Sequence, residues 1–465
     1  MMLLKIASRN ILRNRRRSLI TGSAIAVGAM SMLVFGSFIS FIFAGFETNL
    51  VQRIGHLTVF RQGYFVFGAG NPAAYGIDSY RDAMVLIARD PVLQPMIRVM
   101  TPTQALVGIA GNYSGGNDAA KTFLGVGVVP SDRERMRQWN EYGAGRPYVP
   151  DTRLADNAPE RGLIGGGLAR ILGLCQELKL AGCPVPPVLP SAVDASVPPA
   201  PGLNELSHAE LGAAAAHDAP HLDLLGATAG GAPNVVNMEV AGVDPQGVKE
   251  LDDNYVAMPL PLAQQLVYGR GEHKGTGIVL QLNRSEDLMA ARARLTTLIE
   301  EHHLDLEVRD FSELTPFYGQ VIRLFSAIFL FVTLVMGVIV LFAVVNTMTM
   351  NVLERTNEIG TVRAMGVRRN AIRAQFVVEG GLLGAIGATI GVLLAVVVAL
   401  AINHAGLLWT PPGNANAVPF RLAMPPGPKL MIGTWLGLVL VATLAALMPA
   451  NRAARMPVVD ALRHI

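Results

Sequence analysis

Four long stretches without charged residues dominate the pattern of hydrophobic and polar positions along this chain. They are residues 18–46, 324–353, 380–403 and 430–451. A bilayer core about 30 Å thick needs ~20 apolar helical residues to cross it, so each stretch is long enough to span a membrane. A long polar region separates the first stretch from the other three. The sequence therefore predicts one membrane helix, a large domain outside the bilayer, and three further membrane helices.

The polar region, residues 47–320, mixes strand-like and helix-like patterns. Strand-like alternation occurs at residues 56–60, 235–240 and 277–282. Helical spacing occurs at residues 79–89, 261–267 and 285–302. A region of this length can form one or two hydrophobic cores. We therefore expect a mixed α+β domain inserted between the first and second membrane helices of an otherwise α-helical membrane protein.

Residues 183–232 differ from the rest of this domain. They are biased toward Pro and Ala and hold few large apolar side chains. Such a composition cannot bury enough apolar surface to form a core, so it indicates an exposed insertion. Contact with a partner is one use that this composition allows.

The chain has two cysteines, Cys175 and Cys183, both in the predicted α+β domain. In an oxidising compartment they could close a small loop through a disulfide, and two free thiols are the alternative. A metal site is disfavoured, because no His or further Cys stands nearby at ligand spacing.

Charge is distributed unevenly and predicts the topology. Residues 1–46 hold six Lys/Arg and no acid, and residues 321–465 hold eleven Lys/Arg and four acids. Residues 47–320 hold 21 Lys/Arg and 31 Asp/Glu. Basic residues near the ends of membrane helices are retained in the cytoplasm. We therefore expect both termini and the loop 354–379 in the cytoplasm, and residues 47–320 and 404–429 on the opposite side.

The N-terminal segment 1–17 places Leu3, Leu4, Ala7 and Ile11 on one helical face, with cations opposite. A helix of this kind suits the surface of an anionic leaflet, although a plain topology signal explains the same charges. The uncharged run that follows is longer than the ~7–15 apolar residues of a cleaved signal peptide, so we expect an uncleaved anchor.

No catalytic motif is present. The string Gly269-Arg-Gly-Glu-His-Lys-Gly-Thr has the wrong order for a phosphate-binding loop, and Gly165-Gly166-Gly167 is more typical of a turn before a helix at Leu168. The nine histidines are scattered without a His-Glu-x-x-His pattern. We therefore expect a non-catalytic protein that binds neither metal nor cofactor directly and has no nucleic-acid partner.

Two features of the predicted membrane helices concern packing and transport. Glycines recur at four-residue spacing in the third stretch, which allows close approach of neighbouring helices within the chain or in a dimer; these are Gly380, Gly384, Gly387 and Gly391. None of the stretches carries an ionisable residue at mid-depth. Ion-coupled transporters usually need such residues, so secondary transport and ion conduction are disfavoured.

The loop 354–379 predicts a short amphipathic helix. Ile359, Val362 and Met365 share a helical face, and Gly366 is suited to a C-terminal cap. A helix continuous with two membrane spans could transmit force from a cytoplasmic partner. An ordinary basic cytoplasmic loop would have much the same composition.

Three cytoplasmic elements resemble the FtsX-like permeases, the family that includes lipoprotein-releasing and macrolide-exporting permeases. They are the loop ERTNEIGTVRAMGVRRNAIRAQFVVEGGLLG, the N-terminal RNILRNRRRSLITGSAIAVG and the terminal PANRAARMPVVDALRHI. In the α+β domain, GLIGGGLARILGL and VAGVDPQGVKELDDNYVAMPLPLAQQLVYG are similar to the family's periplasmic core. GHLTVFRQGYF is similar to the lipoprotein-releasing branch.

The resemblance implies an ABC-type permease in the bacterial inner membrane, in which two permease chains, identical or sister, pair with two separate ATPase subunits. ATP and Mg²⁺ would bind to those subunits. The family's coupling contact falls on these positions of the present chain: Glu354, Arg355, Glu358, Ile359, Gly360, Arg363, Met365 and Gly366. No fused ATPase is expected, unlike in the macrolide exporters, and the insertion 183–232 leaves the periplasmic carrier or adaptor open.

Aromatic residues at the outer ends of the first two membrane stretches could line a lateral cavity for acyl chains, or form an interfacial belt. They are Phe38, Phe41, Phe43, Phe46, Phe317, Phe325 and Phe329. The leading hypothesis is extraction of a lipoprotein-like or amphipathic substrate from the outer leaflet by mechanotransmission. An adaptor-linked exporter of small molecules or peptides is one alternative, and a transmitter of signals to a cell-wall or sensor partner is another.

Overall fold

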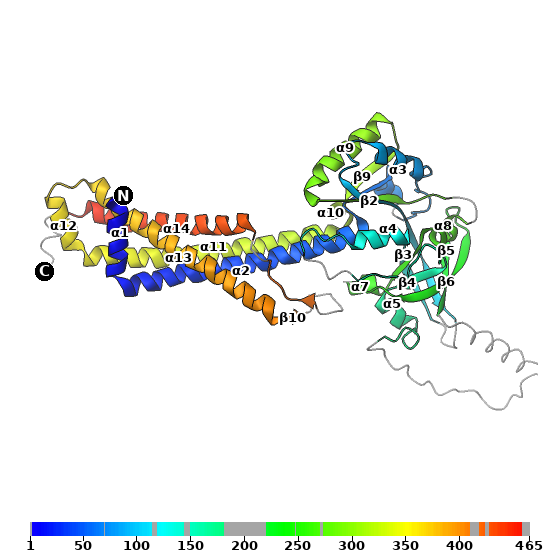
Figure 1. The fold of residues 1–465 in the computed structure, drawn as a ribbon, viewed down its shortest axis with the longest axis horizontal. Coiled ribbons are helices and arrows are strands. Elements are labelled where there is room, and N and C mark those ends of the chain that lie inside the picture. The colour runs from blue at the N-terminus through cyan, green and yellow to red at the C-terminus, as the bar shows by residue number, and fades with distance from the viewer. Residues whose placement is uncertain are drawn as a thin grey trace, which may run out of the picture. The chain divides into compact units, whose positions relative to one another are not determined.

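A computed structural model describes residues 2–68, 70–113, 119–143, 149–180, 220–246, 248–269, 273–409, 418–423 and 427–457. The chain divides into two compact units. The helical unit comprises Met1–Ala44, Phe317–Trp409 and Val418–Ile465, and the α/β unit comprises Gly45–Pro316 with Thr410–Ala417. The mixed fold class expected from the sequence is confirmed (Figure 1).

The helical unit contains four helices that are long and apolar enough to cross a membrane. They are α2 (Arg15–Ile54), α11 (Pro316–Glu354), α13 (Arg369–Ala405) and α14 (Pro428–Arg455). A separate helix α1 (Met2–Arg13) precedes them, and α12 (Thr356–Ala364) links α11 to α13. β10 (Leu408–Trp409) and β11 (Val418–Pro419) pair in antiparallel fashion after α13. The helices run beyond the predicted spans, so much of the predicted loop 354–379 is helical.

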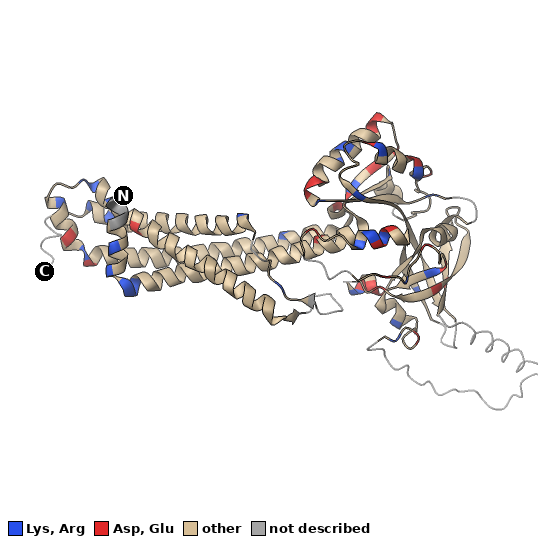
Figure 2. Cartoon of the chain, in the orientation of Figure 1, with Lys and Arg blue, Asp and Glu red and all other residues tan. Residues whose placement is uncertain are grey.

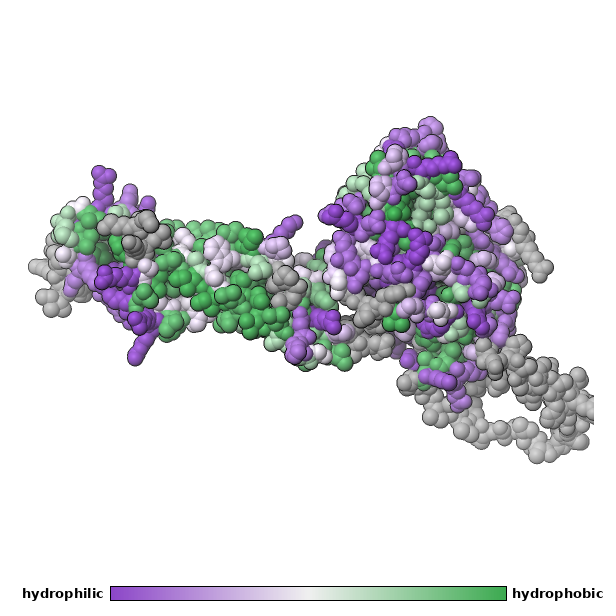
Figure 3. All heavy atoms as spheres, in the orientation of Figure 1, coloured by the Kyte–Doolittle hydropathy of each residue, from purple (hydrophilic) through white to green (hydrophobic). Residues whose placement is uncertain are grey.

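Apolar side chains cover much of the helical unit in Figure 3, and small residues let its helices approach closely. A Cβ on Gly384 would lie 2.6 Å from Ala442 Cβ of α14. A Cβ on Gly391 would lie 2.5 Å from the carbonyl oxygen of Ala26 in α2. Gly380 likewise faces Ala446 of α14, and Gly387 faces Ile25 of α2. The two glycine pairs of α13 therefore contact two different helices of the same chain.

Among the described residues, the two largest hydrophobic cores of the α/β unit share one long strand, β2 (Ile97–Asn112). Its first part pairs with β8 (Gly277–Leu282), and its second part pairs with β3 (Ala119–Val128) and β5 (His221–Ala227). The pairings from β2 through β3, β7 (Tyr255–Pro259), β4 (Arg161–Ile164), β6 (Pro233–Val243) and β5 return to β2, so these six strands close a barrel. Phe123, Leu168, Leu222 and Met238 are fully buried in its core.

The second core lies beside the other part of β2. The order β2-β8-β1-β9 completes the sheet, with β1 (Leu57–Arg61) and β9 (Leu306–Asp310). Side chains of α3 (Tyr80–Arg89) and α9 (Leu288–Glu301) pack on Leu57, Val59 and Leu280 of this sheet. Shorter helices connect the strands: α4 (Pro130–Arg137), α5 (Gly166–Ile171), α7 (Lys249–Asp252), α8 (Leu260–Tyr268), α10 (Phe311–Leu314), the π-helix η1 (Tyr64–Gly68) and the 3₁₀ helix η2 (Ser285–Asp287).

The predicted C-terminal boundary of the insertion 183–232 is wrong. β5 occupies His221–Ala227 as a barrel strand, and Leu222 and Leu224 are fully buried. The alternation in HLDLLGA supplies these inward-facing leucines, although the flanking Pro/Ala-rich sequence obscures the pattern. Residues 181–219 lie outside the described residues.

The three-glycine motif also differs from expectation. Gly165 is the N-cap, and α5 starts at Gly166 rather than at Leu168. The Asp252 carboxylate accepts hydrogen bonds from the backbone N–H of Gly166 (3.0 Å) and Gly167 (2.6 Å). The glycines therefore start a helix that an internal aspartate caps, and they serve the fold rather than a nucleotide.

Candidate coupling site in the helical unit

Charged residues of the helical unit gather where α1, α12 and the adjoining ends of α11 and α14 meet (Figure 2). The chain breaks its helix at Arg355, between the end of α11 at Glu354 and the start of α12 at Thr356. The Thr356 hydroxyl donates to the carbonyl of Leu353 (2.8 Å), which satisfies one terminal acceptor of α11. Gly366 has a positive φ of 91°, which ends α12 with the left-handed turn that glycine permits. The sequence thus encodes a short, sharply bounded helix.

One face of α12 is anchored in the helical unit. Ile359 is buried in a cluster with Val352, Ile372 and Phe376, and Gly360 is buried beside it. The Arg363 guanidinium donates a hydrogen bond to the backbone carbonyl of Met456, just after α14. These contacts hold α12 against the ends of three other helices.

Ion pairs brace the same helix from α1 and α2. Arg13 of α1 lies 3.0 Å from the Glu358 carboxylate, and Arg17 of α2 pairs with Glu354. Arg355 bridges two acids, with its Nε 3.0 Å from Glu358 and an Nη 3.5 Å from Glu379. All three glutamates of α11–α13 in the described residues are therefore engaged.

The electrostatic environment favours the ionised form of Glu358. A hydrogen bond from Arg13, and then one from Arg355, lowers the pKa of this carboxyl. Glu358 in turn raises the pKa of Arg13. Glu358 thus makes contacts within the chain that position α12, and its place at the ATPase contact stays a prediction.

The far end of α12 has a different character, because its apolar side chains have no core to enter. Val362 and Met365 were expected to share a face with Ile359, yet Val362 is 36% exposed and Met365 is 72% exposed. Val367, Arg368 and Arg369 follow, and all three are exposed. We call residues 362, 365 and 367–369 the α12 tip. It combines three apolar side chains with two cations on a rigidly held turn.

In the sequence, Arg13 and Arg17 were interpreted as topology signals or as the cationic face of a helix on an anionic leaflet, and Glu379 was not singled out. The charge distribution of the sequence contains a signal for these ion pairs. Residues 321–465 contain four acids among eleven Lys/Arg. Acids in so basic a region are expected to find ionic partners, and the N-terminal arginines are the partners here.

Four of the aromatic residues proposed for a substrate cavity pack on other aromatic rings. Phe43 lies edge-on to Phe325, with ring centroids 6.4 Å apart, and Phe38 stacks on Phe420 at 4.9 Å. Phe329 stacks on Phe35 at 6.3 Å. Phe41 is partly exposed, whereas Phe46 and Phe317 are exposed. The lateral cavity stays a prediction.

In the α/β unit, the buried His56 starts a hydrogen-bonded chain that runs to the surface. Leu282 N–H donates to His56 Nδ1 (3.0 Å), so Nε2 carries the ring proton toward Ser285 Oγ at 3.1 Å. Ser285 Oγ donates to Glu47 (2.6 Å), and Tyr142 donates to the same oxygen at 2.9 Å. Burial lowers the pKa of His56 to about 4. Because Nδ1 is engaged and Nε2 is a donor, this histidine cannot take a proton from Ser285, and the chain is structural.

Two further sequence-based expectations concern the α/β unit. The described residues contain no group of three or more His, Cys, Asp or Glu placed to hold a metal ion. The proposed disulfide joins Cys175 to Cys183, which lies outside the described residues, so this bridge stays a prediction.

Comparison with known proteins finds similarity in this part of the chain. Residues 328–458, which include α12 and its tip, match the model of the FtsX-like permease C-terminal domain. The macrolide export ATP-binding/permease protein MacB of Neisseria meningitidis is 31% identical over 200 residues, covering 41% of this chain and 28% of that protein. The ABC transporter permease YtrF of Bacillus subtilis is 31% identical over 140 residues, covering 29% of this chain and 31% of that protein.

Solved structures also match. The periplasmic region of MacB from Actinobacillus actinomycetemcomitans covers 57% of this chain and 92% of its own, with 12% identity and a TM-score of 0.30. The extracellular domain of the transporter YknZ covers 55% of this chain and 99% of its own, with 13% identity and a TM-score of 0.28. These relatives belong to the macrolide-export and other permease groups. The similarity to the lipoprotein-releasing branch therefore stays a prediction.

Proposed function

We propose that this FtsX-like permease domain works in an ABC-type complex, in which a separate ATPase binds the α12 tip. The observation that carries this proposal is the contrast within α12. Glu358 and Ile359 tie the helix to its own chain, whereas Met365 projects an uncovered apolar side chain beside Arg368 and Arg369. An exposed apolar turn on a braced helix is suited to insertion into a groove of a partner and to transmission of its movement.

In this proposal, two ATPase subunits bind ATP and Mg²⁺ and a pair of permease chains, identical or sister, binds the ATPases. α2 is a continuous helix of 40 residues that contributes to both units, which supports mechanotransmission from α12 and α1 toward the α/β unit. The complex would lie in the bacterial inner membrane with both termini in the cytoplasm, as the charge distribution predicts.

The proposed substrate is a lipoprotein-like or amphipathic molecule taken from the outer leaflet and passed to a periplasmic carrier. The aromatic residues of α2 and α11 support this choice. The second candidate is adaptor-linked export of small molecules or peptides, which the similarity to macrolide export proteins supports. Crosslinking at Phe325 separates them, because an acylated substrate is captured only in the first case. Signal transmission to a cell-wall or sensor partner without transport is the third possibility.

Copurification of the full chain with its ABC-type ATPase tests the coupling proposal. We expect Met365→Asp to abolish association and ATPase stimulation, because it places a charge in the apolar contact. Met289→Asp is a matched control, since Met289 of α9 is 71% exposed and Met365 is 72% exposed. Equal association of both variants with the ATPase would contradict the proposal.

A further inference from the structure

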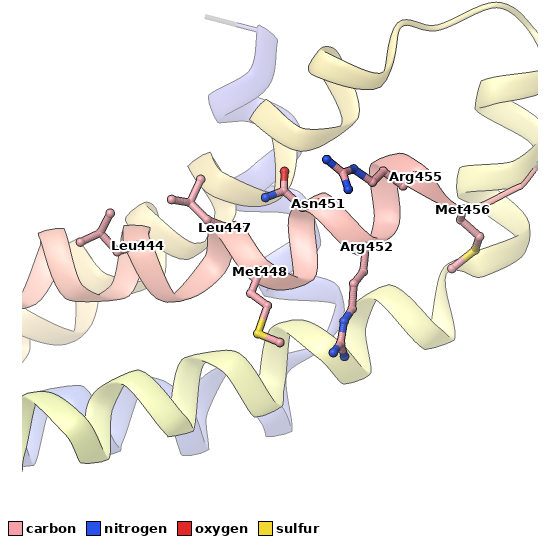
Figure 4. A pocket seen from close by; sticks show the side chains of 7 residues that line it. All are labelled: Leu444, Leu447, Met448, Asn451, Arg452, Arg455 and Met456. Atoms are coloured by element: carbon pink, nitrogen blue, oxygen red, sulfur yellow. The ribbon is translucent and has the colours of Figure 1, made fainter.

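An open groove of about 730 Å³ lies along α14 at its C-terminal end (Figure 4). Its lining residues recur at spacings of three and four along this one helix, so they form one stripe on its surface. The stripe begins with the exposed apolar side chains of Leu444, Leu447 and Met448. It continues with Asn451, Arg452 and Arg455. The groove is therefore apolar at one end and cationic at the other.

The two arginines of this groove differ from the three arginines of the helical unit that form ion pairs. Arg13, Arg17 and Arg355 each pair with a glutamate. Arg452 and Arg455 are exposed, and neither forms an ion pair within the described part of the chain. The two side chains lie one helical turn apart, and Figure 4 shows them on opposite sides of the stripe. A guanidinium group without an ion-pair partner that turns toward the stripe can donate to an anion with several oxygen acceptors. The apolar stripe that leads away from them extends the site along a membrane helix.

We propose that the groove binds an anionic phospholipid. The phosphate accepts hydrogen bonds from Arg452 and Arg455, and an acyl chain lies along Leu444, Leu447 and Met448. This assignment follows from charge complementarity, because a zwitterionic headgroup would add a like charge beside the two cations. The site goes beyond the proposed ATPase coupling and depends only on α14 lying in a membrane.

The site is also linked to α12. Met456 lines the groove, and its backbone carbonyl accepts the hydrogen bond from Arg363. A lipid held at Arg452 and Arg455 therefore lies beside the residue that anchors α12. Occupancy would stiffen this anchor, so anionic lipid would favour the braced position of α12.

Native mass spectrometry of the full chain tests the proposal in detergent with equal parts of phosphatidylglycerol and phosphatidylethanolamine, and without any ATPase. We expect the parent chain to retain phosphatidylglycerol preferentially. Arg452→Gln/Arg455→Gln should weaken that binding about 10-fold or more. Arg452→Lys/Arg455→Lys, which keeps the charge, should recover part of it.

The matched control is Arg368→Gln/Arg369→Gln, which removes the same charge from two exposed residues at the start of α13. Equal losses in the two glutamine double variants would overturn the proposal in favour of general surface charge. So would equal retention of both lipids, or displacement of the lipid by millimolar inorganic phosphate. Because no ATPase is present, a negative result here leaves the coupling proposal standing.

Discussion

The Arg13 guanidinium lies 3.0 Å from the Glu358 carboxylate, so an ion pair joins α1 to α12 across 345 positions of sequence. Both side chains are half exposed, at 52% and 51%. Exposed pairs typically contribute about 0–1 kcal/mol to stability. This pair therefore matters for the relative position of α1 and α12 more than for the free energy of unfolding.

Reversal of one charge in this pair should release α1. We expect a cysteine at Ala7, which is fully buried, to resist maleimide labelling in the parent chain and to react quickly after Glu358→Lys. The charge swap Arg13→Glu/Glu358→Arg should restore protection. Labelling that stays slow in the single variant would show that the pair does not position α1.

Acid should weaken the same bracing. Arg13, and then Arg355, lowers the pKa of Glu358 from its ordinary value of 4.5. A carboxylate with a lowered pKa stabilises the fold at neutral pH, and this contribution is lost as pH falls below about 4.5. Labelling of the Ala7→Cys chain should accelerate in that range. The acceleration should be smaller in the Glu358→Gln background, which has no carboxylate to titrate.

The Arg355–Glu379 pair should matter more for stability, because Glu379 is only 2% exposed. Arg355→Met leaves this carboxylate without its ionic partner, and we expect a loss of roughly 3 kcal/mol. Arg355→Met/Glu379→Gln should recover most of that loss, because the uncompensated charge is gone. Thermal unfolding in detergent measures both effects. A double variant no more stable than the single one would show that packing, not charge, dominates.

Glycine packing makes a separate prediction. Gly391→Ala places a Cβ 2.5 Å from the Ala26 carbonyl oxygen, so α2 and α13 must move apart at a cost of about 2 kcal/mol. Gly437 of α14 has no neighbouring atom within 4 Å of its ideal Cβ. Gly437→Ala should therefore be neutral or mildly stabilising, because alanine favours helix. Thermal unfolding of the two variants measures both effects. Equal losses of stability in the two variants would contradict this prediction.

The α/β unit should lose stability in mild acid through His56. Its pKa is lowered from 6.5 to about 4, because the buried neutral ring is favoured. The free energy of unfolding therefore keeps its full value above pH 6.5. It decreases as pH falls toward 4, by about 3 kcal/mol in total. Fluorescence of Trp139, whose ring centroid lies 5.0 Å from that of His56, is a suitable probe in the full chain. His56→Gln should flatten the pH dependence in this window, even if it lowers stability overall.

The sequence by itself determined the class of the protein. Uncharged stretches long enough for a bilayer, short alternating strands and the glycine at the end of α12 are local patterns, and local physics is enough to interpret them. The family resemblance also rests on contiguous motifs. Strands with clear alternation, such as 235–240 in β6, were predicted correctly, whereas the Pro/Ala-rich sequence before β5 obscured its pattern.

Only the tertiary structure decided how these elements are used. The sequence grouped Ile359, Val362 and Met365 on one face, but α12 ends beside the core, so Ile359 is buried and Met365 is not. Glu358 was predicted at the partner contact, which stays a prediction, and the structure adds its ion pair with Arg13. The glycines of α13 divide between α14 and α2 because helix packing chooses their neighbours. Each of these outcomes depends on residues far apart in sequence, and a linear pattern does not record which of them meet.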